Sequence, residues 1–451
     1  MVLEKSSLLT LQKALDRLEE SFKDLPAYNP TIEVEKVEAV LSTVAERMKD
    51  NFPYPHPLYA GQMLKPPHPI ARLAYTLSLW INPNNHALDG GRASTLMEKE
   101  VVAEIAKMFG WSTALGHLCG GGTMANLESL WIAGQSSPGK KIVASEQAHY
   151  THNRICGVLA LPFQSVESDK FGRMDIRSLK RLLDEGDVGT VVVTIGTTAT
   201  GSVDPLSEIL KLQSQYNFRI HADAAYGGYF TLTDNLRPET TIEYSLLKEV
   251  DSIVIDPHKH GLQPYGCGCV LFRDPSVGRF YKHDSPYTYF TSSEIHLGEI
   301  SLECSRPGSA AVALWATQQL LPLEKGGEFA KSLSRCREAA KKLFEKVSND
   351  GRFLTAFAPE LDILIWAVKA ESVSRSSLLA KEIFVQASKE GLHLATADLP
   401  IKFFVENFPD MIYDQQRITC FRSCLLKPEH LDWIDHIWQT LDKVTRLTLT
   451  K

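Results

Sequence analysis

The sequence lacks an uninterrupted apolar run long enough to cross a bilayer, and it begins with a charged amphipathic pattern in place of an apolar signal region. It also lacks a strong charge imbalance, because 48 basic and 54 acidic residues leave a net charge of −6 at pH 7. These absences argue against a membrane or a nucleic acid as the main partner. We therefore expect a cytoplasmic protein that acts on a small molecule.

Closely spaced cysteines are also scarce. The eight cysteines are scattered along the chain, and Cys267 and Cys269 are the pair separated by a single residue. One intervening residue is too few for a common zinc knuckle, and this pair lies in a pattern typical of a strand. We therefore expect reduced thiols and no metal site.

What the chain does contain is a regular alternation of strand and helix patterns. Short apolar runs rich in β-branched residues recur at 141–145, 190–195, 219–222, 251–255 and 268–272. This alternation predicts an α/β fold with a mostly parallel sheet covered on both faces.

Outside that region the patterns change. We predict an N-terminal helical segment over residues 1–55, a large domain over 56–315 and a smaller α+β domain over 316–451. Within the large domain, Ser94 or Thr95 is expected to cap a helix that runs to Phe109.

The stretch 251–261 joins a short apolar run to a lysine between two histidines. The run is bounded by polar residues and followed by Pro257, which predicts a buried strand that leads into a loop. A lysine delivered into a pocket by a strand end can act as an amine nucleophile and form a Schiff base with a carbonyl such as that of pyridoxal phosphate. From this stretch alone, an ordinary surface position for Lys259 fits equally well.

A glycine cluster at 120–122 leads into a second helix pattern that begins near Thr123. Glycines let the backbone approach a ligand closely, and the first N–H groups of a helix favour an anion such as phosphate. Gly122 and Thr123 are the residues expected to donate hydrogen bonds to such a phosphate. The cluster matches neither the nucleoside-triphosphate loop nor the dinucleotide fingerprint, and a plain tight turn fits as well.

Several polar residues follow the predicted strands, and ligands of such sheets bind beyond the carboxyl ends of the strands. One crevice could therefore collect 120–123, His149, 197–198, Asp223 and Lys259.

Pyridoxal phosphate would suit this set of residues. Lys259 would hold its aldehyde, and Asp223 would keep its pyridine nitrogen protonated, which the ring requires as an electron sink. A buried aspartate without a partner is costly, so Asp223 should have a cation or a metal as its partner. We expect the remaining cofactor contacts to come from His149 stacked on the ring, Gly122 and Thr123 at the phosphate, Thr197 or Thr198 at the phenolate, and His258. A turn aspartate and a structural histidine are the alternatives.

Five motifs occur in an order that resembles the pyridoxal-phosphate-dependent group II amino-acid decarboxylases. They are Gly-Gly-Thr-x-Ala-Asn-Leu at 121–127, Gln-Ala-His at 147–149, Gly-Thr-Thr-x-Thr-Gly at 196–201, His-x-Asp-Ala-Ala-Tyr-Gly-Gly at 221–228 and Asp-Pro-His-Lys at 256–259. The resemblance covers residues 50–325 and weakens after that. It includes relatives that decarboxylate aromatic amino acids, tyrosine, histidine, glutamate or aspartate.

The resemblance implies an aspartate-aminotransferase-type fold (fold type I), a pyridoxal-phosphate cofactor and a homodimer with active sites at its interface. It adds Ala225 to the cofactor-binding residues. It also implies that a tyrosine on the loop after the lysine protonates the carbanion once carbon dioxide has left. Tyr287 and Tyr289 are both candidates for that residue, and an aromatic that packs in the core or at an interface is the alternative.

The resemblance leaves the substrate open. The Asp-Pro-His-Lys motif followed by Gly261 is most similar to the tyrosine decarboxylase branch, whereas residues 92–93 and Gly120 depart from the family pattern. An acidic substrate would need an arginine or a lysine in the pocket, with Arg92 and Arg306 as candidates, and an aromatic one would need the region of Phe52, Tyr54 and Tyr59. A carbon–carbon lyase resembling sphingosine-phosphate lyase and a non-catalytic scaffold are the rival interpretations.

Overall fold

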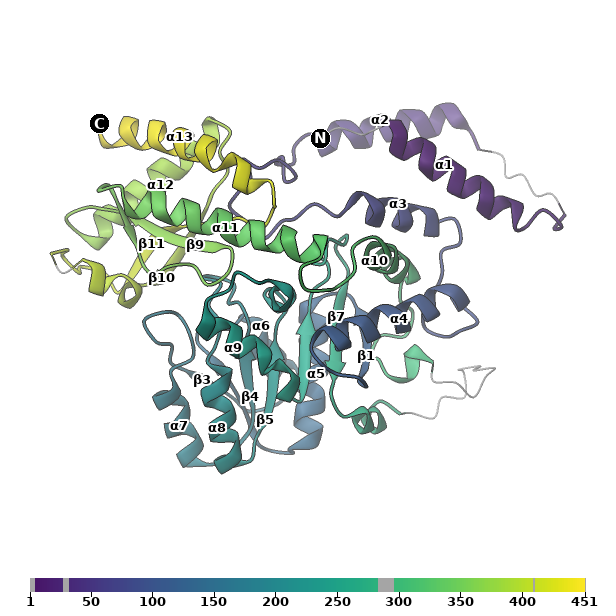
Figure 1. Cartoon of the computed structure of the whole chain (residues 1–451), viewed down its shortest axis with the longest axis horizontal. Coiled ribbons are helices and arrows are strands. Elements are labelled where there is room, and N and C mark those ends of the chain that lie inside the picture. Colours follow the sequence, from purple (N-terminus) through teal and green to yellow (C-terminus); the bar gives the residue numbers. More distant parts are fainter. Residues whose placement is uncertain (1–4, 27–31, 283–295, 409, 451) are drawn as a thin grey trace.

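A computed structural model describes residues 5–26, 32–282, 296–408 and 410–450. The described part contains a seven-stranded sheet, a four-stranded sheet and the helices that cover them (Figure 1). The two candidate loop tyrosines, Tyr287 and Tyr289, lie outside the described residues, so their assignment stays a prediction.

The large sheet has the strand order β1-β7-β6-β5-β4-β2-β3. Its strands are β1 Leu115–Cys119, β2 Lys141–Ser145, β3 Phe163–Val166, β4 Val188–Thr194, β5 Arg219–Asp223, β6 Ser252–Ile255 and β7 Gly268–Phe272. The pairs from β3 to β6 are parallel, and β7 is antiparallel to both β6 and β1. The predicted α/β class and mostly parallel sheet are therefore confirmed.

Helices cover both faces of this sheet because alternate residues of each strand point to opposite sides. Val191 and Val193 of β4 belong to a core that includes residues of α7 Ile176–Glu185 and α8 Leu206–Tyr216. Val192 belongs to a different core with residues of α5 Gly122–Ser136 and α6 Thr151–Val158. A continuous run of valines is thus what a strand buried on both faces requires.

The small sheet is antiparallel and has the order β10-β11-β9-β8. Its strands are β8 Phe353–Thr355, β9 Ile363–Val368, β10 Ala395–Pro400 and β11 Arg417–Cys424. Helices α11 Glu328–Ser348, α12 Val373–Lys389 and α13 His430–Leu449 pack against it through a core centred on Trp366, which stacks on Phe421 at 4.2 Å between ring centroids. The domain boundaries near residues 55 and 315 stay a prediction.

The N-terminal helices are α1 Lys5–Glu20, α2 Val34–Met48, α3 Pro69–Ser78 and α4 Arg92–Met108. α3 and α4 both pack against α10 Gly308–Leu320, and α1 packs against α3. α1 and α2 both lie at one side of the molecule (Figure 1). The predicted cap of α4 is wrong. The helix starts earlier, at Arg92, because the Ser94 side chain is buried and bonds to Asn85 instead of a helix-start amide.

The remaining described α-helix is α9 Pro238–Ser245, which lies beside α8. Among the described residues, none of the helices has the length and apolar character needed to cross a membrane.

Candidate active site

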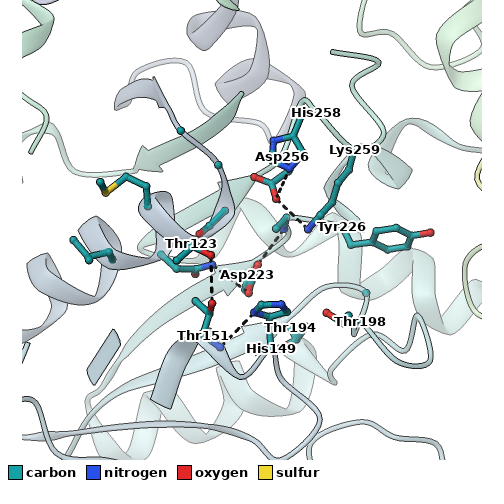
Figure 2. Close-up of a pocket in the computed structure, with 18 of the residues that line it drawn as sticks. Thr123, His149, Thr151, Thr194, Thr198, Asp223, Tyr226, Asp256, His258 and Lys259 are labelled. Atoms are coloured by element: carbon teal, nitrogen blue, oxygen red, sulfur yellow. Dashed lines mark hydrogen bonds and ion pairs between the residues drawn. The ribbon is translucent and has the colours of Figure 1, made fainter. Parts of the chain in front are cut away.

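A cavity of about 520 Å³ lies beyond the carboxyl ends of β4, β5 and β6, next to the first turn of α5 (Figure 2). Thr194 and Asp223 end β4 and β5 side by side, since they pair in register, and Asp223 pairs in turn with Val254 of β6. The ends of successive strands therefore lie next to one another at this edge of the sheet. The cavity is lined by Gly120–Leu127 except Ala125, His149, Thr151, Thr194, Gly196, Thr198, Asp223, Ala225, Tyr226, Asp256, His258, Lys259 and Glu303.

The structure brings together the site residues that the sequence predicted within its described part. These are Gly122, Thr123, His149, Thr198, Asp223, Ala225, His258 and Lys259. Thr197, the alternative to Thr198, is wholly buried and its hydroxyl bonds to Thr200 instead of facing the cavity. Of the two threonines, Thr198 is therefore the one placed to meet a ligand.

Lys259 enters the cavity from the turn that follows β6. Its Nζ lies 3.0 Å from Oδ2 of Asp256, and 23% of its side chain is exposed (Figure 2). Asp256 is almost wholly buried, so the lysine supplies the positive charge that this carboxylate needs. The amine is thus held at one side of the cavity by a residue of its own motif.

Asp223 forms another wall. Its Oδ2 accepts a hydrogen bond from His152 Nε2 at 2.8 Å and a longer one from Asn126 Nδ2 at 3.4 Å, while Oδ1 accepts from the Ala225 amide at 3.1 Å. Burial by itself would raise the pKa of Asp223, but the bond from His152 and the charges of His152 and Lys259 outweigh it and hold the pKa below its ordinary value. Asp223 is therefore an ionised carboxylate at neutral pH.

A chain of hydrogen bonds beneath Asp223 fixes the orientation of Asn126. The Asn126 amide nitrogen donates to the Gly122 carbonyl at 2.8 Å, and its oxygen lies 2.8 Å from His221 Nε2. Burial lowers the pKa of His221 to about 3, so this ring is neutral. His221 then donates through Nε2, and its Nδ1 accepts from the Ser252 hydroxyl at 2.9 Å. Asn126 thereby links the carboxylate wall to the start of α5.

The start of α5 has no room for a side chain at Gly122. Gly121 has φ +142°, and a Cβ on Gly122 would lie 2.7 Å from Asp256 Oδ2. The amides of the first turn have no carbonyl partner within the helix, and the helix dipole adds positive potential there. Beside them, the hydroxyls of Thr123 and Thr151 lie 3.4 Å apart. This end of the cavity is therefore suited to an anion.

Two histidines complete the walls. Burial lowers the pKa values of His149 and His258 below the ordinary range, so both rings are neutral near pH 7. His149 Nδ1 accepts from the Thr151 amide at 3.3 Å, which fixes the orientation of its ring. His258 Nδ1 is buried and has no hydrogen-bond partner within the described chain, so it is available to a ligand.

These residues fit pyridoxal phosphate. The cavity presents an amine at Lys259, an ionised carboxylate at Asp223, a flat ring at His149 and a helix start at Gly122. They match the aldehyde, the pyridine nitrogen, the ring face and the phosphate of that molecule. The donor set contains no group that contradicts the fit.

Sequence reasoning missed several residues that the structure places at the site. A partner was expected for Asp223 but not identified, and it is His152, which lies in the first turn of α6, three residues after His149. A second histidine so soon after the Gln-Ala-His motif could have indicated it. Glu303, which accepts from the Gly120 amide at 3.3 Å, gave no signal because 183 residues separate the two.

The two arginines named as candidates for binding an acidic substrate lie elsewhere, so this cavity does not meet that expectation. Arg306 is buried against Glu98 at 2.9 Å and also bonds to the Leu118 carbonyl. Arg92 opens α4, beside a separate groove. Neither lines the cavity, whose described lining includes Lys259 as its one lysine and no arginine.

Comparisons with known proteins agree with this site. The model of the pyridoxal-dependent decarboxylase conserved domain matches residues 138–369. A probable L-tyrosine/L-aspartate decarboxylase from Methanothermobacter thermautotrophicus is 31% identical over 262 residues, which are 57% of this chain and 69% of that protein. The L-tyrosine decarboxylase of Enterococcus faecium is 24% identical over 82% of this chain and 81% of its own.

Solved structures show the same fold. Mouse CSAD superposes with a TM-score of 0.78 at 19% identity, covering 98% of this chain and 99% of its own. Oryza sativa TDC with PLP and tryptamine gives a TM-score of 0.77 at 16% identity and covers 99% of both chains. Fold type I is thereby confirmed. The chain belongs to the pyridoxal-dependent decarboxylase family and is an amino-acid decarboxylase that uses pyridoxal phosphate.

Proposed function

We propose that this chain removes the α-carboxylate of L-tyrosine as carbon dioxide and releases the corresponding amine. The observation that carries the proposal is the single cavity in which Lys259 and Asp223 meet the glycine-rich start of α5. The names of relatives that act on L-tyrosine and L-aspartate support the same substrate class.

Pyridoxal phosphate, when bound, supplies an electron sink for the pair of electrons left when carbon dioxide departs. The chain's own residues do the rest. Lys259 holds the aldehyde end, the first turn of α5 binds the phosphate, and Asp223 holds a proton at the pyridine nitrogen. His149 orients the ring through its face. Tyr287 or Tyr289 is proposed to return a proton to carbon.

The charge of the cavity favours tyrosine over aspartate. Glu303 contributes a carboxylate to the wall, and no arginine is present among the described lining residues to bind an acidic side chain. The neutral phenol of tyrosine is not repelled by that carboxylate and needs no arginine. Phe52, Tyr54 and Tyr59 form an aromatic cluster, in which the rings of Tyr54 and Tyr59 lie 4.9 Å apart edge to face. The cluster does not line this cavity, so its role in binding the substrate's side chain stays a proposal.

We also propose that the protein acts as a homodimer in the cytoplasm. None of the described side chains of α2 is buried, although the helix carries the apolar stripe Val34, Val37, Leu41, Val44 and Met48. A second copy of the chain would cover such a stripe. All eight cysteines are unpaired, which supports a reducing compartment.

The test is a screen of the twenty amino acids and one phosphorylated amino alcohol with the enzyme loaded with pyridoxal phosphate, measuring both carbon dioxide and aldehyde. The proposal expects carbon dioxide and tyramine from L-tyrosine, with little turnover of L-aspartate. Aldehyde release from a phosphorylated amino alcohol without carbon dioxide would favour the carbon–carbon lyase. No turnover by wild type with any of these compounds would contradict the proposal.

A further inference from the structure

Among the described residues, the one side-chain hydrogen bond of His152 goes to Asp223, and its ring also lies edge-on to His221 at 6.5 Å between ring centroids. The ring is 1% exposed, and its Nε2 lies 2.8 Å from Asp223 Oδ2. Its Nδ1 is buried and has no hydrogen-bond partner within the described chain. A buried polar atom without a partner is costly, so a ring that only filled space here would be better replaced by an apolar one.

The other donors to Asp223 are weaker or serve the opposite oxygen. Asn126 reaches Oδ2 at 3.4 Å, the long end of the hydrogen-bond range, and the Ala225 amide binds Oδ1. Among the described residues, His152 forms the one ion pair recorded for Asp223. His152 is therefore the main group that satisfies Oδ2.

His152 connects the Asp223 carboxylate to His149 in the cavity wall. Its backbone amide donates to the His149 carbonyl at 3.2 Å, in the turn that starts α6. His149 and Asp223 both line the cavity (Figure 2), whereas His152 does not line it and contacts Asp223 through its Nε2. One short turn thus positions both the ring beside the ligand and the donor behind the carboxylate.

We propose that His152 is a positioning residue for the decarboxylase reaction: through its Nε2–H it keeps the Asp223 carboxylate ionised and oriented to hold the proton of the cofactor's pyridine nitrogen. The inference rests on the proposed role of Asp223. A charge-assisted hydrogen bond to a buried carboxylate is among the stronger interactions in proteins. Without it, the carboxylate loses the hydrogen bond that most opposes the effect of burial, and the balance moves toward the neutral acid, which cannot keep a proton on the pyridine.

Two substitutions separate the donor from the shape of the ring. His152→Phe keeps a flat ring and removes the N–H, whereas His152→Gln keeps an N–H donor and removes the ring. The dissociation constant of pyridoxal phosphate is measured by titrating the apo-protein and following intrinsic fluorescence. We expect His152→Phe to weaken binding about tenfold or more, and His152→Gln to stay within about threefold of wild type.

A second readout follows the absorption spectrum of the bound cofactor between pH 6 and 9. Wild type and His152→Gln should keep one band shape, while His152→Phe should show a pH-dependent change like that of Asp223→Asn. The double variant His152→Phe/Asp223→Asn should add little to either single change, because both act through one contact. Circular dichroism establishes that each variant is folded, and His152→Leu replaces His152→Phe if the latter does not fold.

The proposal is overturned if the donor-free variant binds pyridoxal phosphate as wild type does and keeps its spectrum. It is equally overturned if His152→Gln loses as much affinity as His152→Phe, since the ring shape would then be what matters. Failure of wild type itself to bind the cofactor would instead contradict the proposed function.

Discussion

Lys259 Nζ and Asp256 Oδ2 form an ion pair of 3.0 Å between residues three apart in one turn. The same carboxylate oxygen lies 2.7 Å from where a Cβ on Gly122 would stand. The lysine, its counter-ion and the start of α5 therefore meet at one point. The Asp-Pro-His-Lys motif combines the amine with the charge that compensates it.

Removing the lysine should leave Asp256 as an uncompensated buried charge. We expect Lys259→Ala to lower the free energy of unfolding of the apo-protein at pH 7 by about 2 kcal/mol, and Asp256→Asn in the same chain to restore at least about 1 kcal/mol. Urea unfolding of wild type, both single variants and the double variant measures the coupling. Strictly additive effects would show that the ion pair contributes nothing.

Gly122 should not tolerate a methyl group. We expect Gly122→Ala to weaken binding of pyridoxal phosphate at least about tenfold, because the added Cβ meets the Asp256 carboxylate and displaces the first turn of α5. Gly157→Ala is the matched control, since it lies in a helix with nothing within 4 Å of the added Cβ. The control should bind as wild type does. Equal affinities for both variants would contradict the assigned phosphate end.

His221 should make the apo-protein sensitive to acid. Its pKa is lowered by burial to about 3, whereas an unfolded chain has the ordinary value near 6.5, so the unfolded state binds one more proton between these values. The contribution of neutral His221 to the free energy of unfolding is fully present above about pH 6.5, and about 2 kcal/mol of it is lost by pH 5. Urea unfolding at pH 7 and pH 5 should show this loss, and His221→Gln should reduce the slope. An unchanged slope in the variant would assign the acid sensitivity to other groups.

Tyr226 connects the cavity wall to the small-sheet region through Asp362, whose Oδ1 accepts its hydroxyl at 2.7 Å. Burial raises the pKa of Asp362 to about 6, above the unfolded value near 4, so stability falls as pH rises through this window. Tyr226→Phe removes a donor to the charged form, and the pKa should rise further. The free energy of unfolding of Tyr226→Phe should therefore be only slightly below that of wild type at pH 5, and about 1–2 kcal/mol below it at pH 8. A deficit that is equal at both pH values would mean that the phenol does not stabilise the charged carboxylate.

Much of the fold could be predicted because its strands carry a strong local signal. β4 is buried on both faces, and its run of valines has few other interpretations. β1 was missed, since Leu115–Cys119 contains glycine and histidine and is a strand only because β7 pairs with it. The start of α4 was misplaced for a similar reason: the Ser94 hydroxyl bonds to Asn85, a tertiary contact that local capping rules do not contain.

The site was predictable where residues stand in motifs at strand ends, as Asp223 and Lys259 do. The residues that support them were not, because they act through contacts between distant parts of the chain. His152 meets Asp223 across 71 positions, and Tyr226 meets Asp362 across 136. Such contacts depend on how the elements pack in the folded chain, and a single stretch of sequence does not contain that information.

The most direct test of the central claim is the identity of the residue that holds the cofactor. Wild-type protein is loaded with pyridoxal phosphate, treated with borohydride, digested and analysed by mass spectrometry. The account predicts a pyridoxyl label on the peptide that contains Lys259, weaker labelling in Asp223→Asn and none on that peptide in Lys259→Ala. A label on another lysine of wild type, or no label at all, would contradict it.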